Sequence, residues 1–180
     1  AFWEVYGGKK FVELVNEEVR EMMPAGGEHG GITGKLQTHI GNFVEENNLG
    51  YVTAAETGYI LYKDPTPEGK DTVRGPDVGF IALHRLPDGL PEKYIPFGPD
   101  LAVEVVSPGN SADDIQEKID DYFLPDTGTR LVWVVYPRSK TVNIHTREGA
   151  KRVGIDGILD GGDVLPGFRL EVARIFPKPK

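Results

Sequence analysis

The chain has 180 residues, of which 39% are hydrophobic and 27% charged, as is usual for one folded domain with a buried core. Its 20 basic and 28 acidic residues give a formal net charge of −8, which argues against a protein that coats nucleic acid by bulk electrostatics but allows a local basic face. The absence of cysteine excludes disulfides, thiolate metal sites and cysteine nucleophiles. No apolar run approaches the length of a membrane span, so we expect a cytoplasmic protein without a membrane partner.

The first half of the chain predicts a hairpin, a helix and two strand regions. Residues 9–24 hold two short alternating apolar runs, the pattern of a β-hairpin that lies on a core. The next apolar residues recur at helical spacing and predict a helix that ends near residues 47–48: Ile32, Leu36, Ile40, Phe43 and Val44. Residues 51–62 and 77–83 are strand-like. The four prolines and two glycines of residues 85–100 predict a long surface loop.

The second half predicts a strand around Glu104, a helix and two further strands. Ser111 and Asp114 form a capping box, so the helix begins near Ala112, and Lys118 lies beside its apolar stripe. Strands follow at residues 130–137 and 141–148. Because strands come before, between and after two helices, the sequence predicts one α/β domain over residues 1–180 with a mixed sheet.

Glu104 stands between Val103 and Val105 in a run that otherwise has the composition of a buried strand. An ionised carboxylate loses its hydration there, so it is paired, protonated, at the solvated end of the strand, or bound to a metal. Asp100 shares the same face of the strand but lies about 13 Å away along it, too far to bind the same cation. A partner for Glu104 must therefore come from another element.

Asp77 is the other acidic residue at the start of an apolar strand, and adjacent strands lie only about 5 Å apart, so the two carboxylates can meet. Such a pair is stabilised by a hard divalent cation such as Mg²⁺. Alternatively, Asp77 is a turn residue after Pro76. Lys118 is placed to reach inward along the sheet, or else it buries only its stem and leaves its charge in water.

These residues carry a family resemblance. Pro76 and Asp77, then Glu104 to Pro108, then the helix with Lys118, resemble the PD-(D/E)XK nuclease superfamily and, more closely, its large prokaryotic family of restriction-endonuclease-like proteins of the Uma type. The resemblance extends over most of the chain. It implies a restriction-endonuclease-like core, a mixed β-sheet flanked by two main helices with an N-terminal β-hairpin.

The resemblance also implies a catalytic site. Asp77 and Glu104 would be ligands of Mg²⁺, or of Mn²⁺, together with the backbone carbonyl of Val105. The lysine expected two residues after the glutamate is replaced by Val106, and Lys118 on the following helix is the residue that matches its role. Glu28, with His29 beside it, is a further catalytic candidate, although a first-turn acid that interacts with the helix dipole is the alternative interpretation.

The reaction so implied is hydrolysis of a phosphodiester bond in DNA, assisted by the cation. Residues 130–152 contain six basic residues and one acid, Glu148, a net charge of +5 that is a candidate DNA-facing segment or a charged, solvated sheet edge: Arg130, Arg138, Lys140, Arg147, Lys151 and Arg152.

Two functions remain open. The first is a metal-dependent endonuclease that acts as a homodimer, as the resemblance implies. The second is a non-catalytic interaction or nucleic-acid-binding module on the nuclease fold, in which Asp77, Glu104 and Lys118 form a buried ion cluster that holds the sheet and helix in register.

Overall fold

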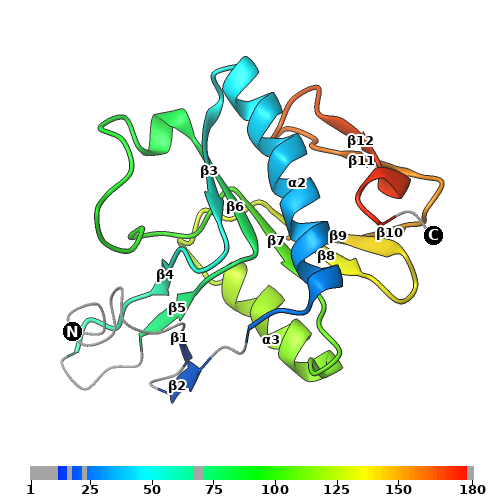
Figure 1. The fold of residues 1–180 in the computed structure, drawn as a ribbon. Helices are drawn as coiled ribbons and strands as arrows, with labels where there is room; N and C mark the ends of the chain where they lie inside the picture. Colours follow the sequence, from blue (N-terminus) through cyan, green and yellow to red (C-terminus); the bar gives the residue numbers. More distant parts are fainter. Residues whose placement is uncertain (1–11, 16–17, 22–23, 67–70, 178–180) are drawn as a thin grey trace.

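The structure, a computed structural model, describes residues 12–15, 18–21, 24–66 and 71–177. Two long helices, α2 (Gly27–Glu46) and α3 (Ala112–Tyr122), pack on a central sheet (Figure 1). The described residues form this sheet of six strands, a second sheet of four and a two-stranded ribbon. Short 3-10 turns, η1 (Leu83–Arg85) and η2 (Val172–Arg174), follow β6 and β12.

The six-stranded sheet has the order β10-β9-β8-β7-β6-β3. Its strands are β3 (Gly50–Ala54), β6 (Val78–Ala82), β7 (Leu101–Val105), β8 (Leu131–Tyr136), β9 (Thr141–Thr146) and β10 (Gly149–Val153). Among the neighbouring strand pairs of this sheet, only β7 and β8 run parallel, and α3 connects these two strands. Their near-continuous apolar sequences, LAVEV and LVWVVY, suit central strands that are buried on both faces.

The two helices lie on opposite faces of this sheet, and each presents an apolar stripe to it. The α2 face contains buried residues of the helix, the sheet and the C-terminal ribbon, among them Ile32, Leu36, Ile40, Val103, Trp133, Leu159 and Leu170. The α3 face contains the strand residues that alternate with those of the α2 face, together with residues of the helix, among them Ala102, Ile115, Ile119, Tyr122, Val132 and Val134. Glu104 is two residues from Ala102 on the same strand, so its side chain lies on the same face and points toward α3.

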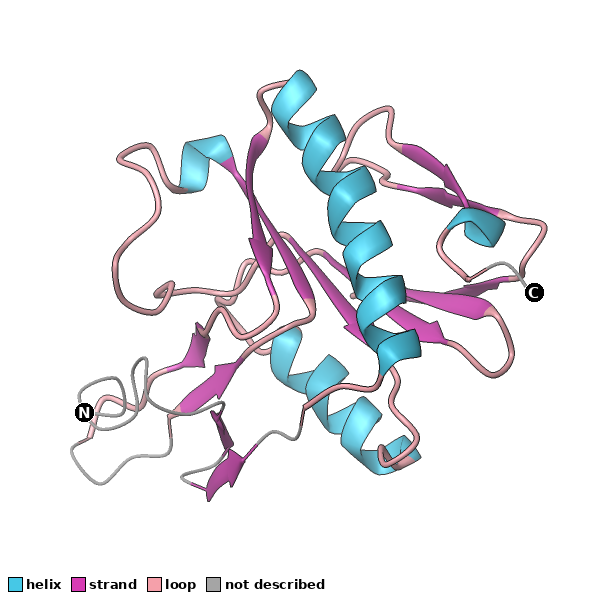
Figure 2. Ribbon diagram, in the orientation of Figure 1, coloured by secondary structure: helices cyan, strands magenta, loops and turns pink. Residues whose placement is uncertain are grey.

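The four-stranded sheet, order β2-β1-β5-β4, lies beside α3 (Figure 2). It comprises β1 (Val12–Val15), β2 (Glu18–Glu21), β4 (Tyr59–Tyr62) and β5 (Thr72–Arg74). Hydrogen bonds from Arg74 and Arg20 reach acids of α3. The ribbon of β11 (Ile158–Asp160) and β12 (Arg169–Glu171) extends the core on the α2 side.

The mixed sheet, the two flanking helices and the antiparallel N-terminal hairpin of β1 and β2 confirm the predicted fold class. The capping box at Ser111 and the start of α3 at Ala112 are confirmed as well. The first helix starts at Gly27, with Glu28 in its first turn, and ends at Glu46, close to the predicted end. Two details differ. Residues 51–62 form two strands in different sheets. Residues 95–100 are largely buried, because Ile95 bridges to Tyr59 and Asp100 accepts from the backbone of Ala82. Within the described ranges, no helix is long and apolar enough to cross a membrane.

Candidate active site

Asp77 and Glu104 face one another across neighbouring strands. The antiparallel register of β6 and β7 pairs Val78 with Val103, so the next pair outward is Asp77 with Glu104. Asp77 Oδ2 accepts a 2.7 Å hydrogen bond from the backbone N–H of Val105. Both side chains are nearly enclosed, with 13% and 6% of their surfaces exposed. The strand geometry therefore places two carboxylates side by side at the carboxyl end of β7.

Helix α3 supplies two donors to Glu104. Lys118 Nζ lies 2.9 Å from Glu104 Oε2, and the buried hydroxyl of Tyr122 donates to Oε1 at 2.7 Å. The two donors are four residues apart and so lie one turn apart on the same side of the helix. Lys118 thus extends its amine inward to the carboxylate rather than outward to solvent.

A second carboxylate approaches Lys118 from the four-stranded sheet. Glu13 Oε1 of β1 lies 3.6 Å from Lys118 Nζ, and Glu13 is itself buried. Its Oε2 accepts from Arg74 at 3.0 Å, and its Oε1 accepts from the backbone N–H of Gly75 at 3.2 Å. Arg74 is almost fully enclosed and also binds Asp121 of α3. The candidate site is therefore built from both large sheets and α3.

The electrostatics show an excess of negative charge. Burial raises the pKa of Glu104 to about 7, opposed by Lys118 and reinforced by Asp77 and Glu13. Burial alone would lower the pKa of Lys118, but Glu104 and Glu13 outweigh it and raise that pKa above its usual value. The neighbouring carboxylates act in the same direction on both groups, because negative charge favours a bound proton on Glu104 and on Lys118 alike. Lys118 is therefore protonated at neutral pH.

His29, in the first turn of α2, completes the surroundings of Asp77. Its Nε2 lies 3.2 Å from Asp77 Oδ2, and this hydrogen bond raises the pKa of the imidazole against the opposing effect of burial. His29 Nδ1 is buried and has no hydrogen-bond partner among the residues that the structure describes. The adjacent Glu28 is exposed, and no contact joins it to the carboxylates within the described part of the chain.

The fold agrees with the comparisons. A family model described as "Uma2: Putative restriction endonuclease" matches residues 3–173. The chain belongs to this family. No curated protein matches it. A solved structure of a protein from Anabaena variabilis ATCC 29413, described as "a putative nuclease belonging to DUF820", has a TM-score of 0.77 to this structure at 16% sequence identity. The match covers 92% of this chain and 89% of the Anabaena chain, and it shows that the two proteins share a fold.

In this Uma2 family member, the structure brings together three of the four catalytic candidates from sequence, Asp77, Glu104 and Lys118, and leaves Glu28 apart. Sequence reasoning missed Glu13 and Tyr122 as members of the site. Tyr122 carried a signal, since it lies four residues after Lys118 on the predicted stripe. Glu13 also carried one, because it interrupts an apolar run in the same manner as Glu104.

The oxygen donors fit a small hard cation. Mg²⁺ is commonly held by one or two carboxylates, with water completing its octahedron. Asp77 and Glu104 supply two carboxylates. Val105, the last residue of β7 and the neighbour of Glu104, supplies a backbone carbonyl. Among the described residues no group of three or more His, Asp or Glu is arranged to hold a metal ion. The protein side of such a site would therefore be these two carboxylates and the carbonyl.

The basic segment divides between the two ends of the sheet. Arg130 precedes β8 and lies 3.4 Å from Asp100, and Arg147 follows β9 and donates to the backbone carbonyls of Phe123 and Leu124. These contacts lie at the end of β8 opposite to the carboxylate pair, because β8 runs parallel to β7. Arg130 and Arg147 are therefore engaged away from the candidate site.

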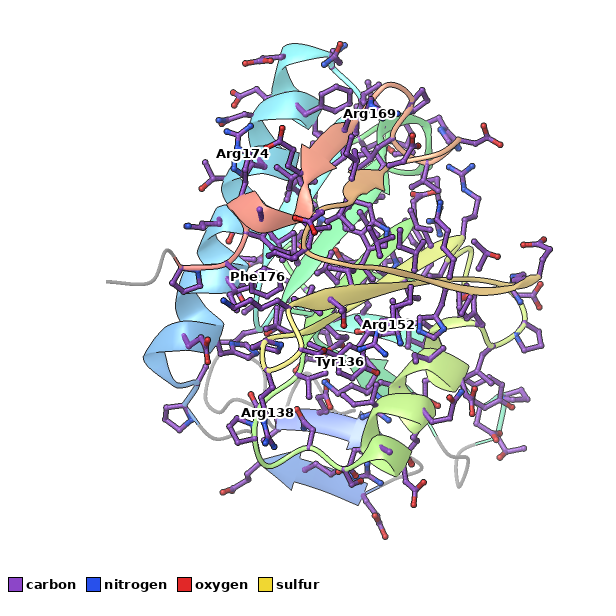
Figure 3. All side chains as sticks on the ribbon, turned by 90° about the vertical axis from the view of Figure 1, so that its right-hand side faces the viewer. Tyr136, Arg138, Arg152, Arg169, Arg174 and Phe176 are labelled. Carbon is purple, nitrogen blue, oxygen red and sulfur yellow. The ribbon has the colours of Figure 1, made fainter. Side chains whose placement is uncertain are left out.

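Three of the four remaining basic residues lie toward the carboxylate end. Arg138 and Lys140 occupy the exposed turn after β8 and make no ion pair within the part of the chain that the structure describes. Arg152 is on the same cross-strand row as Glu104, through Asn143 and Val134. Three strand spacings separate Arg152 from Glu104 by about 14 Å. Figure 3 shows Arg138 and Arg152 on one side of the molecule.

Proposed function

We propose that this protein is a metal-dependent endonuclease that hydrolyses phosphodiester bonds in DNA. The observation that carries the proposal is the pair of facing carboxylates, Asp77 and Glu104, with the protonated amine of Lys118 held 2.9 Å from Glu104. Two carboxylates beside a cationic amine match the needs of phosphoryl chemistry, in which a cation and a fixed positive charge offset the charge on phosphate. Membership of the Uma2 family and the nuclease-like fold support the same function.

Asp77, Glu104 and the carbonyl of Val105 would hold Mg²⁺ or Mn²⁺. When bound, the cation polarises the scissile phosphate and acidifies the attacking water. The backbone N–H of Val105 and the imidazole of His29 fix the orientation of Asp77. The hydroxyl of Tyr122 fixes Glu104. These contacts hold both carboxylates in place before substrate arrives, which reduces the reorganisation needed during the reaction.

Lys118 would act as a positive charge rather than as a base. A general base must be unprotonated at the working pH, and the carboxylates around Lys118 raise its pKa. Its amine can instead donate hydrogen bonds to the attacking water or to a phosphate oxygen. The expected consequence is that the amine lowers the barrier by stabilising the negative charge of the transition state.

The charge distribution supports a nucleic-acid substrate despite the net charge of −8. Arg138, Lys140 and Arg152 lie toward the carboxylate end of the sheet, and phosphate contacts by such residues position a duplex without reading its sequence. We propose that DNA approaches the site over this side of the molecule (Figure 3). We further propose that the enzyme is cytoplasmic and acts as a homodimer, a state that sedimentation of the purified protein would test.

The test is cleavage of supercoiled plasmid and of short single- and double-stranded oligonucleotides with Mg²⁺ or Mn²⁺. We expect nicking by the wild type, and a rate lower by at least about 100-fold, but still measurable, in Asp77→Asn, Glu104→Gln and Lys118→Met. Asp113→Asn is the matched control, because Asp113 is an exposed acid at the start of the same helix as Lys118. RNA substrates in the same assay decide whether DNA is preferred. Full activity of the three site variants would refute the proposal.

One observation favours the second function, a non-catalytic module. Lys118, Glu104 and Glu13 form a buried ion cluster that joins α3 to both sheets, and such clusters can serve the specificity of a fold rather than catalysis. A wild-type protein that is inert on every substrate, and whose melting temperature does not respond to divalent cations, would favour this function.

A further inference from the structure

Lys118 is held between carboxylates from two different sheets. Glu104 Oε2 of the six-stranded sheet lies 2.9 Å from its amine, and Glu13 Oε1 of the four-stranded sheet lies 3.6 Å from it. The Lys118 side chain is only 14% exposed, so protein surrounds most of it and restricts its movement. A single ion pair constrains the flexible four-carbon stem of lysine less than two partners on different sides do.

Glu13 is itself anchored, and its anchors do not depend on Lys118. Arg74 donates to its Oε2 at 3.0 Å, and the backbone N–H of Gly75 donates to its Oε1 at 3.2 Å. Arg74 is fixed in turn by Asp121, which lies three residues after Lys118 on the same helix. Glu13 thus presents a rigid negative charge to Lys118 from outside the facing carboxylate pair.

We propose that Glu13 is a positioning residue for the proposed nuclease reaction. Through an ion pair from the N-terminal sheet, Glu13 holds the amine of Lys118 at the reacting phosphate. The inference rests on the proposed function of the site. A divalent cation held by Glu104 would weaken the attraction between Glu104 and the amine, and Glu13 would remain as the partner that keeps the amine in place. The docking of β1 against α3 then becomes a requirement for catalysis and not only for folding.

The first experiment separates positioning from folding. Glu13→Gln removes the charge but nearly preserves the shape, and we expect kcat to fall about 10- to 100-fold, the usual effect of losing a residue that orients an active-site group. The KM for DNA stays within about twofold, since Glu13 is buried and does not face substrate. Arg20→Gln is the matched control, because Arg20 joins the same N-terminal sheet to Glu117 of α3 without touching Lys118. We expect wild-type kcat for this control well below its melting temperature.

A second pair of variants keeps the proposal falsifiable if Glu13→Gln folds poorly. Glu13→Asp retains the charge that neutralises Arg74, but its shorter side chain draws back from Lys118, so we expect a smaller fall in kcat. In a Lys118→Met background, Glu13→Gln should have no further effect on kcat, because its influence passes through the missing amine. Wild-type kcat in both Glu13 variants, or full additivity with Lys118→Met, would overturn the inference.

A readout that does not need activity distinguishes this inference from the proposed function. The rate at which acetic anhydride labels Lys118, followed by peptide mass spectrometry, should rise several-fold in Glu13→Gln and remain at the wild-type value in Arg20→Gln. If the wild type cleaves nothing, the proposed function fails while the labelling still tests the contact. Equal labelling rates in wild type and Glu13→Gln would refute the positioning role of Glu13.

Discussion

Arg74→Met should destabilise the protein strongly, because Arg74 is the central cation of a buried cluster. Its side chain is 1% exposed and binds Glu13 at 3.0 Å, Asp121 at 2.6 Å and Glu117 at 3.2 Å. Methionine fills similar volume but leaves the enclosed carboxylates of Glu13 and Asp121 without their shared partner. Breaking a buried pair in this way costs about 3–5 kcal/mol. For a chain of this length we expect a melting temperature lower by roughly 10 °C.

The assay is thermal and urea unfolding at neutral pH, with Arg20→Met as the control. Arg20 belongs to the same network, but its side chain is 40% exposed, so its loss should cost under about 1 kcal/mol. Burial already raises the pKa of Asp121 in the wild type. Acidification neutralises the stranded carboxylates, so the deficit of Arg74→Met should shrink at low pH. A melting temperature within about 2 °C of the wild type would refute the claim that Arg74 neutralises buried charge.

Three further outcomes are expected. Mg²⁺ at ten times its dissociation constant should stabilise the wild type by about 1.4 kcal/mol, and an unchanged shift in Asp77→Asn would contradict the metal site. Burial raises the pKa of Glu104 from 4.5 to about 7, so the stability that its neutral form contributes is present below pH 4.5 and lost as the pH rises through 7. As the pH rises through this window, the free energy of unfolding of Glu104→Gln, measured with urea, should increase by about 3 kcal/mol relative to that of the wild type. Free energies of unfolding that change in parallel with pH in the two proteins would contradict this reasoning. Gly79→Ala would place a Cβ against the Tyr59 hydroxyl and 2.8 Å from Thr53 Oγ1, so urea titration should show a loss of about 1–3 kcal/mol, and wild-type stability would mean that the strands adjust freely.

Local rules were sufficient for the elements that carry the carboxylate pair. The alternation of β7 placed Glu104 on one face, the capping box located the start of α3, and Lys118 lay beside the stripe of that helix, within reach of the sheet or of solvent. Asp77 could be matched to Glu104 because adjacent strands are about 5 Å apart, and the register of β6 and β7 has this pairing. The catalytic roles of these residues stay predictions until cleavage is measured.

The sequence by itself thus predicted the two main helices, the central strands and the mixed α/β class, and it singled out Asp77, Glu104 and Lys118, since periodicity, capping and strand spacing act over a few residues. It did not predict the short strands β5, β10, β11 and β12. Only the tertiary structure decided what surrounds them. Glu13 meets Arg74, 61 residues away, and Lys118 because the N-terminal sheet docks on α3. His29 meets Asp77 because α2 begins at the same edge of the sheet where β6 starts. The pattern within one element carries no information on which distant element packs against it, so these contacts depend on how the layers assemble.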